Sequence, residues 1–342
     1  MMGRLYRGET NFDFVGNRKK AFFISGLFIV LSLGALVINQ LNLGVDFSGG
    51  TVVEVENVNA IDIGQLRDAL RPLGLDGAQI QELDSGTRKV LRVQTEAITD
   101  AQQQELIDAV SAAAGSTESS VTSVGPTFGR DIASSAIRAL VIFLIVIAIF
   151  ISLRFEVAMA FGALAALFHD LIITAGIYAL TGLEVTPATV IAILTILGYS
   201  LYDTVVVFDK VSENLRAEED AGRIPHYRTV INESMNQVLM RSINTSLTSL
   251  LPIASLLVVG SLLLGATTLQ DFALALFVGI AAGTYSSIFV ASPVLSLLKD
   301  RIESDPPSRA EVGADKDTAR PGTGPVTRPG GAAPRAPKKR KR

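Results

Sequence analysis

Long apolar runs alternate with polar segments along this 342-residue chain. About 20 mostly apolar residues are needed to cross a hydrocarbon core about 30 Å thick, and six of the runs reach that length. The pattern therefore predicts an α-helical polytopic membrane protein with six transmembrane helices. We place them at residues 21–41, 133–153, 157–181, 187–208, 242–264 and 268–298.

The segment between the first two runs, residues 42–131, has a different pattern. Residues 51–58 alternate apolar and polar, which is typical of a half-buried strand. Helical spacing of apolar residues begins after Asp62 and again after Thr99, and Thr99 with Gln102 fits a capping box. The element order is βαββαβ, which predicts a small ferredoxin-like α+β domain, with the remaining strands at residues 79–83, 89–94 and 120–124.

The composition narrows the possible chemistry. Charged residues make up 18% of the chain, against about 25% in an average soluble domain. The chain has no cysteine, which excludes disulfides, thiolate metal sites and cysteine nucleophiles. Its two histidines disfavour a multi-histidine metal centre, so we expect neither a metal nor a cofactor.

The distribution of charge predicts the orientation in the membrane. Basic residues precede the first run and follow the second, fourth and sixth, whereas residues 42–131 hold fourteen acidic and six basic residues. Basic loops stay cytoplasmic, so we expect both termini in the cytoplasm, with 42–131 on the other side of the membrane. The expected organisation is a cytoplasmic N-terminus (1–20), a first transmembrane helix (21–41), the extracytoplasmic domain (42–131), transmembrane helices two to six (132–300) with a cytoplasmic loop at about 209–240, and a tail (301–342).

The tail is rich in Pro, Gly and Ala and ends in five basic residues. Such a composition cannot bury a core, so we expect residues 301–342 to be disordered and cytoplasmic. Two interpretations remain open: a solvated tail that reinforces the orientation, or a contact with anionic lipid headgroups or ribosomal RNA. The sequence gives no reason to expect specific nucleic-acid binding.

No phosphate-binding loop, dinucleotide-binding motif or common protease motif occurs in the chain. An ATPase, a dehydrogenase or a common protease is therefore disfavoured, and we expect a protein that is not an enzyme. If the chain does work on a substrate, its energy must come from a partner or from an ion gradient.

Ionisable residues interrupt the apolar runs at His169, Asp170 and Asp203, and Arg241 stands at the start of the fifth run. A charge at mid-bilayer costs about 2.5–3.5 kcal/mol on insertion scales, so such residues mark functional sites. Asp203 and Arg241 belong to antiparallel neighbouring helices, and we expect them to meet and form a two-state proton site. The alternatives are a static ion pair that fixes helix packing, or an aspartate near the cytoplasmic interface. His169 and Asp170 are weaker candidates.

Rows of small residues predict close helix contacts. They serve either packing within this bundle or a seam with a second bundle. The rows are Gly279, Gly283 and Ser287, and Ala158, Gly162 and Ala166.

Several of these segments carry a family resemblance. The stretch 198–214 (GYSLYDTVVVFDKVSEN) resembles the signature of the SecD/SecF family of protein-export membrane subunits, within the RND superfamily. Residues 43–51 (LGVDFSGGT) resemble the motif that follows the first span in that family, and 124–129 (VGPTFG) resembles the motif that enters the second. The stretches 168–170 and 240–246 also fit, so the resemblance covers residues 12–300 in order.

The resemblance implies roles for particular residues. Asp203 and Arg241 match family positions that are implicated in proton conduction, while Tyr202 stands where the family often has asparagine. The glycine-rich motifs imply either hinges between domain and spans or simple turn chemistry. The hinge or motif positions are Gly44, Asp46, Gly49, Gly50, Gly125, Pro126 and Gly198.

The resemblance also implies partners and a function. A six-span chain is half of an RND-type arrangement, so SecD would supply the other half. The pair would act beside the SecYEG channel, using proton-motive force to promote translocation and release of a preprotein that SecA has started on its way. The alternatives are an RND-like proton-coupled exporter of small molecules or lipids, which the few aromatic residues of the domain disfavour, and a structural scaffold.

Overall fold

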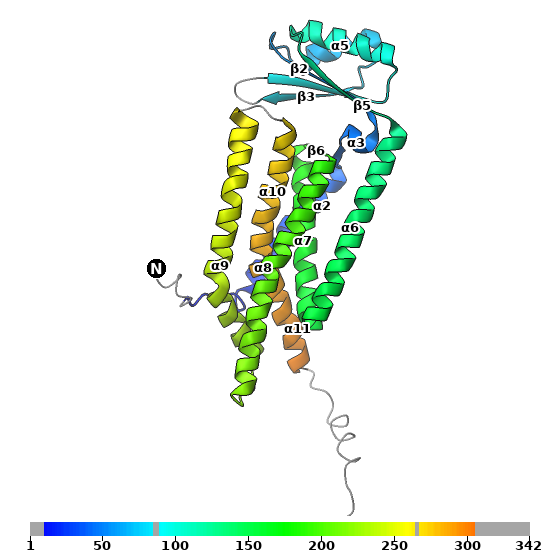
Figure 1. Ribbon diagram of the computed structural model, residues 1–342. Coiled ribbons are helices and arrows are strands. Elements are labelled where there is room, and N and C mark those ends of the chain that lie inside the picture. Colours follow the sequence, from blue (N-terminus) through cyan, green and yellow to red (C-terminus); the bar gives the residue numbers. More distant parts are fainter. Residues whose placement is uncertain (1–9, 85–88, 264–266, 305–342) are drawn as a thin grey trace, which may run out of the picture. The chain divides into compact units, whose positions relative to one another are not determined.

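The computed structural model describes residues 10–84, 89–263 and 267–304. Among these residues, six helices are long and apolar enough to cross a membrane, which confirms the predicted fold class (Figure 1). The predicted tail lies outside the described residues from position 305 onward. The spans are α2 (Arg18–Ile38), α6 (Pro126–Arg154), α7 (Val157–Thr181), α8 (Pro187–Asp220), α9 with the π-helix η2 (Tyr227–Ser255 and Leu256–Leu263), and α10 with the π-helix η3 and α11 (Thr267–Ser286, Ser287–Ala291 and Ser292–Ser304).

Helices α8 and α9 extend well beyond the apolar runs that predicted them. Helix α8 ends at Asp220 rather than near residue 208, and α9 begins at Tyr227 rather than near 242. The connection expected at about 209–240 is therefore mostly helical. Hydropathy marks the bilayer and not the helix end, and the apolar face continues through Val211, Leu215 and Ile231, which are all buried.

The segment between α2 and α6 forms a four-stranded antiparallel sheet with the strand order β3-β4-β2-β5. Two helices pack together on one face of this sheet. This arrangement confirms the predicted ferredoxin-like domain. Its elements are β2 (Gly50–Glu56), α4 (Ile63–Leu70), the 3-10 helix η1 (Arg71–Leu73), β3 (Gln79–Asp84), β4 (Lys89–Thr95), α5 (Asp100–Ala114) and β5 (Ser119–Val124).

Alternation along the strands gives the sheet two different faces. Val53 and Leu91 are fully buried against α4 and α5 in the core of the domain. Their neighbours Val52, Glu54 and Arg92 lie on the opposite face, because successive side chains on a strand point to opposite sides. The helix face thus stabilises the domain, while the other face presents charge toward the spans.

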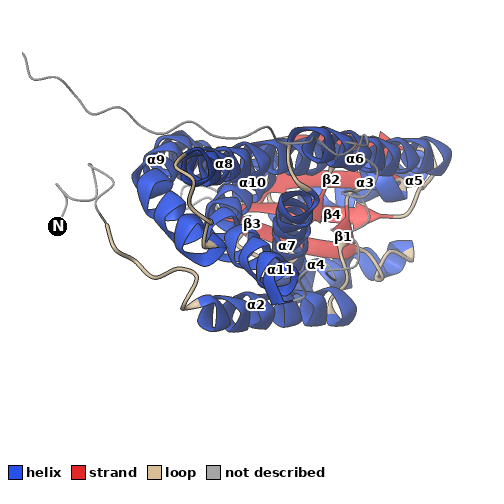
Figure 2. Cartoon of the chain, turned by 90° about the horizontal axis from the view of Figure 1, so that it is seen from below, coloured by secondary structure: helices blue, strands red, loops and turns tan. Residues whose placement is uncertain are grey.

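Short elements connect the domain to the spans. Strand β1 (Asn42–Leu43) and the single turn α3 (Val45–Ser48) lead from α2 into the sheet. Strand β1 pairs in parallel with β6 (Glu184–Val185), which joins α7 to α8. The view from below in Figure 2 shows β1 and the sheet behind the helices. The domain is therefore tied to the bundle at two chain connections and at the β1–β6 pair.

The N-terminal strap, residues 10–15, crosses α9. The backbone N–H of Phe12 donates to Asn236 Oδ1 at 2.9 Å, and that of Phe14 donates to Asn232 Oδ1 at 2.8 Å. Phe14 is buried in the core of the bundle. These contacts connect the first described residues with the fifth span.

Candidate functional site

Two carboxylates lie inside the helix bundle. Asp203 of α8 is 4% exposed and Asp170 of α7 is 0% exposed. Each occupies the inward face of its helix, where α7, α8 and α10 pack together. Side chains from four helices surround them in what we term the intramembrane polar cluster: His169, Asp170, Ser200, Asp203, Thr204, Ser242, Ser286 and Ser287.

Asp203 accepts one hydrogen bond from the bundle. The hydroxyl of Ser242 on α9 donates to Asp203 Oδ1 at 2.9 Å. The second oxygen, Oδ2, is buried without a hydrogen-bond partner in the described part of the chain. A carboxylate oxygen left unsatisfied in a low-dielectric interior destabilises the charged form, so this group is suited to take up and release a proton.

The predicted meeting of Asp203 with Arg241 is not observed. Arg241 is exposed, and its guanidinium donates to the hydroxyl of Tyr202 at 3.0 Å, while Asp203 contacts Ser242 instead. Adjacent residues on a helix point about 100° apart, so Tyr202 and Arg241 face outward where Asp203 and Ser242 face inward. Helix order alone therefore does not decide which side chain contacts Asp203, because helix rotation also matters.

The carboxyl group of Asp170 has more hydrogen-bond partners than that of Asp203. Ser200 Oγ donates to its Oδ2 at 2.5 Å, Ser286 Oγ donates to the same oxygen at 2.8 Å, and His169 Nδ1 lies 3.1 Å from Oδ1. His169 stacks on Tyr285 with ring centroids 5.9 Å apart, and its Nε2 is buried without a partner among the described residues. The structure thus places both weaker candidates in one buried pair.

Hydroxyl groups continue from Asp170 toward Asp203. Ser286 and Ser287 both reach the Gly283 carbonyl, at 3.1 and 2.8 Å. Ser287 also accepts from Thr204 at 3.1 Å, and Thr204 is the residue after Asp203. The π-helix η3 begins at Ser287, and single-turn π-helices often occur at functional sites. The acids therefore belong to one polar cluster.

Sequence reasoning did not predict that the four serines of this cluster contact the two acids or link them. A signal was present, because Gly283 and Ser287 belong to a predicted row of small residues. A side chain at Gly283 would meet Ser200 Cβ at 2.9 Å, so α10 approaches α8 closely at this point. That approach brings the hydroxyls of α10 within reach of both acids.

The predicted hinge positions lie where the domain joins the spans. Gly49 and Gly50 have φ values of +75° and +136°, and a side chain at Gly49 would meet Pro126 Cα at 2.6 Å. Gly125 is the N-cap residue of α6, and the N–H of Gly44 donates to the Val185 carbonyl at 3.0 Å.

Of the two remaining motif positions, Gly198 lies apart from this junction and Asp46 lies beside it. Gly198 belongs to α8, where an added side chain would meet no other atom within 4 Å. Asp46 belongs to α3 and lines a cavity beneath the sheet. In the part of the chain that the structure describes, no group of three acidic or histidine residues is placed to hold a metal ion.

Comparison with known proteins identifies the family. Residues 105–301 match the model of the C-terminal region of the SecD/SecF protein export membrane proteins, and residues 34–56 match the SecD/SecF GG motif. The protein translocase subunit SecF of Mycobacterium tuberculosis (strain ATCC 25618 / H37Rv) is 40% identical over 312 residues, which cover 88% of this chain and 70% of the relative. The chain belongs to the SecF family. It is a multi-pass membrane protein and a non-enzymatic subunit of a protein translocase.

Other SecF proteins and solved structures agree. SecF of Streptomyces coelicolor is 42% identical over 310 residues, covering 90% of this chain and 81% of the relative. The crystal structure of SecDF, a translocon-associated membrane protein from Thermus thermophilus, matches with a TM-score of 0.76 and 34% identity over 86% of this chain. SecDF in its super-membrane-facing form matches with a TM-score of 0.62 and 32% identity over 89% of the chain. The chain covers only 39% and 40% of these two structures.

Proposed function

We propose that this SecF chain works with SecD to use the proton-motive force for preprotein translocation and release across the bacterial cytoplasmic membrane. The observation that carries the proposal is Asp203, a buried carboxylate in a membrane helix with one unsatisfied oxygen. A charge that crosses 100 mV releases about 2.3 kcal/mol, which is enough to bias a domain motion coupled to it. Asp170 and His169 would form a second station for the proton.

The exposed pair of Arg241 and Tyr202 supports a second membrane subunit. Tyr202 is 52% exposed, and Arg241 is also exposed, although both belong to membrane-spanning helices. A guanidinium facing lipid is unfavourable, and polar groups at this depth face a bundle interior or a water-filled cavity. We place SecD against this face of α8 and α9. Its contact would decide when Arg241 can approach Asp203.

The remaining assignments complete the proposal. Both termini and the connection between α8 and α9 lie in the cytoplasm, and the sheet domain lies outside, in agreement with the distribution of basic residues. The translocating preprotein leaves the SecYEG channel near the sheet domain, and SecA acts only indirectly. The junction at Gly49, Gly50, Gly125 and Pro126 is the place where domain motion would arise.

The test is export of a slow secretory reporter in cells depleted of this protein. Asp203→Asn should fail to restore export, because the amide of asparagine cannot take up and release a proton as a carboxyl group can. Asp209→Asn serves as the matched control, since Asp209 belongs to the same helix and forms only an exposed ion pair with Arg154. Both variants must reach wild-type levels in the membrane and must co-purify with equal amounts of SecD. Full complementation by Asp203→Asn would falsify the proton-relay role and leave a scaffold.

A further inference from the structure

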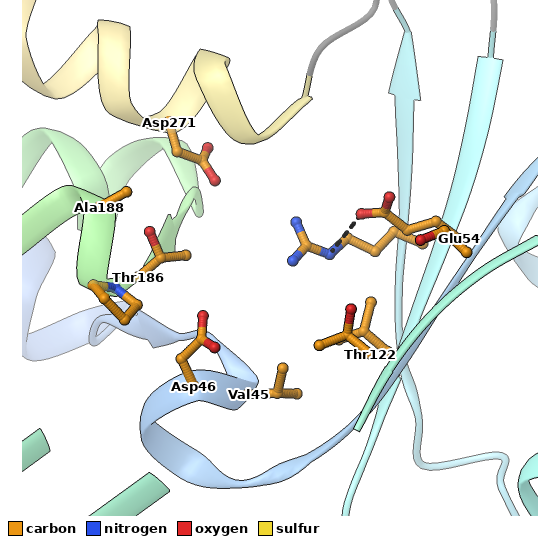
Figure 3. Close-up of a pocket in the computed structure, with 11 residues that line it drawn as sticks. Val45, Asp46, Glu54, Thr122, Thr186, Ala188 and Asp271 are labelled. Carbon is orange, nitrogen blue, oxygen red and sulfur yellow. Dashed lines mark ion pairs between the residues drawn. The ribbon is translucent and has the colours of Figure 1, made fainter. Parts of the chain in front are cut away.

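A cavity of about 380 Å³ lies between the charged face of the sheet and the outer ends of the spans. Figure 3 shows the carboxyl groups of Asp271 on α10 and Asp46 on α3 turned into this space, with Glu54 on the sheet side. Arg92 of β4 also lines it. We call this cavity the junction chamber.

The chamber carries more negative than positive charge. Glu184 of β6 is 3% exposed, and its Oε2 lies 2.7 Å from Arg92 Nη2. Arg92 also pairs with Glu54 at 3.5 Å, so two acids already share its guanidinium. With Asp46 and Asp271, four carboxylates lie in the chamber or beside it, and Arg92 is the one cation among the described residues that line it.

Asp271 is a buried acid of the chamber that forms no ion pair within the described residues. Its side chain is 7% exposed, and within the described residues its carboxyl group forms no ion pair and no hydrogen bond. A buried carboxylate in this state is unfavourable unless a cation or a proton reaches it. Because the group faces the junction chamber, a cation that enters the chamber can supply the missing partner.

The dispersion of the acids indicates the kind of cation. No three carboxylates in the described ranges converge closely enough to chelate a metal ion. A lysine or arginine side chain instead carries several N–H donors at the end of a long apolar stem. The chamber matches both parts, since Val45, Val52 and Pro187 line it beside the acids.

We propose that the junction chamber binds a lysine or arginine side chain of a polypeptide that passes beneath the sheet domain, with Asp271 and Asp46 as its partners. This inference rests on the proposed function for the origin of the polypeptide. One charged side chain held at a time gives weak, salt-sensitive binding. The junction chamber can therefore slow the backward movement of the polypeptide without holding it permanently.

The test uses the full chain purified in detergent and a fluorescent peptide of glycine, serine and alanine with one central arginine. The comparison peptide carries citrulline, which keeps the shape and loses the charge. The arginine peptide should bind about tenfold more tightly than the citrulline peptide at low salt. A factor of about ten is what one charge-assisted hydrogen bond contributes to binding. Asp271→Asn should remove that difference, whereas Asp76→Asn, at an exposed turn of the sheet domain, should retain it.

Two further measurements keep the result decisive. Asp46→Asn should weaken binding of the arginine peptide, and it provides the answer if Asp271→Asn does not fold. Equal binding of the two peptides by wild type overturns the proposal. The proposal is also overturned if the variants bind the arginine peptide like wild type but no longer co-purify with SecD. The chamber would then form part of a subunit contact. The binding test needs no proton gradient, so a negative result does not affect the role proposed for Asp203. Likewise, complementation by Asp203→Asn would not affect the peptide site proposed here.

Discussion

In the sheet domain the core between the sheet and its two helices is built of aliphatic side chains, among them Val53, Leu66 and Leu91. The helix bundle also buries aliphatic residues, but it encloses Asp170 and Asp203 with a set of hydroxyls at its centre. The bundle instead turns apolar residues outward, for example along α6, where many are at least half exposed: Ile137, Ile142, Ile145, Val146, Ile149 and Leu153.

The difference follows from the solvent of each region. Water surrounds the domain, so burial of apolar area stabilises it. Lipid tails are as apolar as leucine, so close packing and polar contacts between helices hold the bundle together. A polar residue is therefore tolerated at the centre of the bundle, where it can do chemistry, while the domain keeps its charges on the face opposite its core.

The largest effect is expected from Leu91→Ala in the domain. Leu91 is 0% exposed, and truncating such a side chain costs about 2–5 kcal/mol of unfolding free energy. Leu153→Ala is the control, since that leucine is 84% exposed on α6 and should change stability by less than about 0.5 kcal/mol. Native-state hydrogen exchange of the β2 amides in the full chain measures both. Equal losses would contradict the contrast between the regions.

A smaller effect is expected from Ser286→Ala in the bundle. The variant removes a donor to Asp170 and leaves that acid with Ser200 and His169. An under-satisfied buried acceptor costs about 1–3 kcal/mol. Thermal unfolding in detergent should show this loss, while Ser255→Ala, whose exposed hydroxyl bonds only to its own helix, should unfold like wild type. A neutral Ser286→Ala would mean that the polar cluster does not stabilise the bundle.

The smallest effect concerns Glu184, which lies between the two regions. Burial raises the pKa of Glu184 above its ordinary value of 4.5, although Arg92 acts in the opposite direction. The folded chain therefore binds this proton more tightly than the unfolded chain does. The stability that this proton contributes is fully present below pH 4.5 and is lost as the pH rises through the folded pKa. A tenfold difference in proton affinity between the folded and unfolded chains corresponds to about 1.4 kcal/mol.

Glu184→Gln should flatten this part of the stability profile. The measurement is the thermal midpoint of the full chain as the pH is raised from the ordinary pKa of glutamate to neutrality. Glu118→Gln, at an exposed position before β5, should keep the wild-type slope. A slope that persists in Glu184→Gln would assign the titration to another group.

The sequence predicted what local patterns encode. Apolar runs located the spans, alternation located the strands, and the capping box of Thr99 and Gln102 is present as expected. The choice of Asp203 followed from the cost of a charge in the membrane and needed no structure. That residue lies inside the bundle as such a cost requires.

Features that depend on helix rotation or on distant contacts were not accessible. The partner of Asp203 proved to be Ser242 because the rotation of α9, and not its order, decides which residue faces inward. The junction chamber is lined by Asp46, Glu54, Arg92 and Asp271, which come from four separate elements. No single stretch of sequence carries a pattern for such a site.

The N-terminal strap also affects how the chain is made. Phe12 reaches its hydrogen-bond partner on α9 across 224 residues of sequence. At a synthesis rate of about 5–20 residues per second, that partner leaves the ribosome roughly 10–45 s after the strap does. During this interval the strap must wait at the membrane surface while four more spans insert. The strap is therefore among the last segments to reach its final position, although it is made before all six spans.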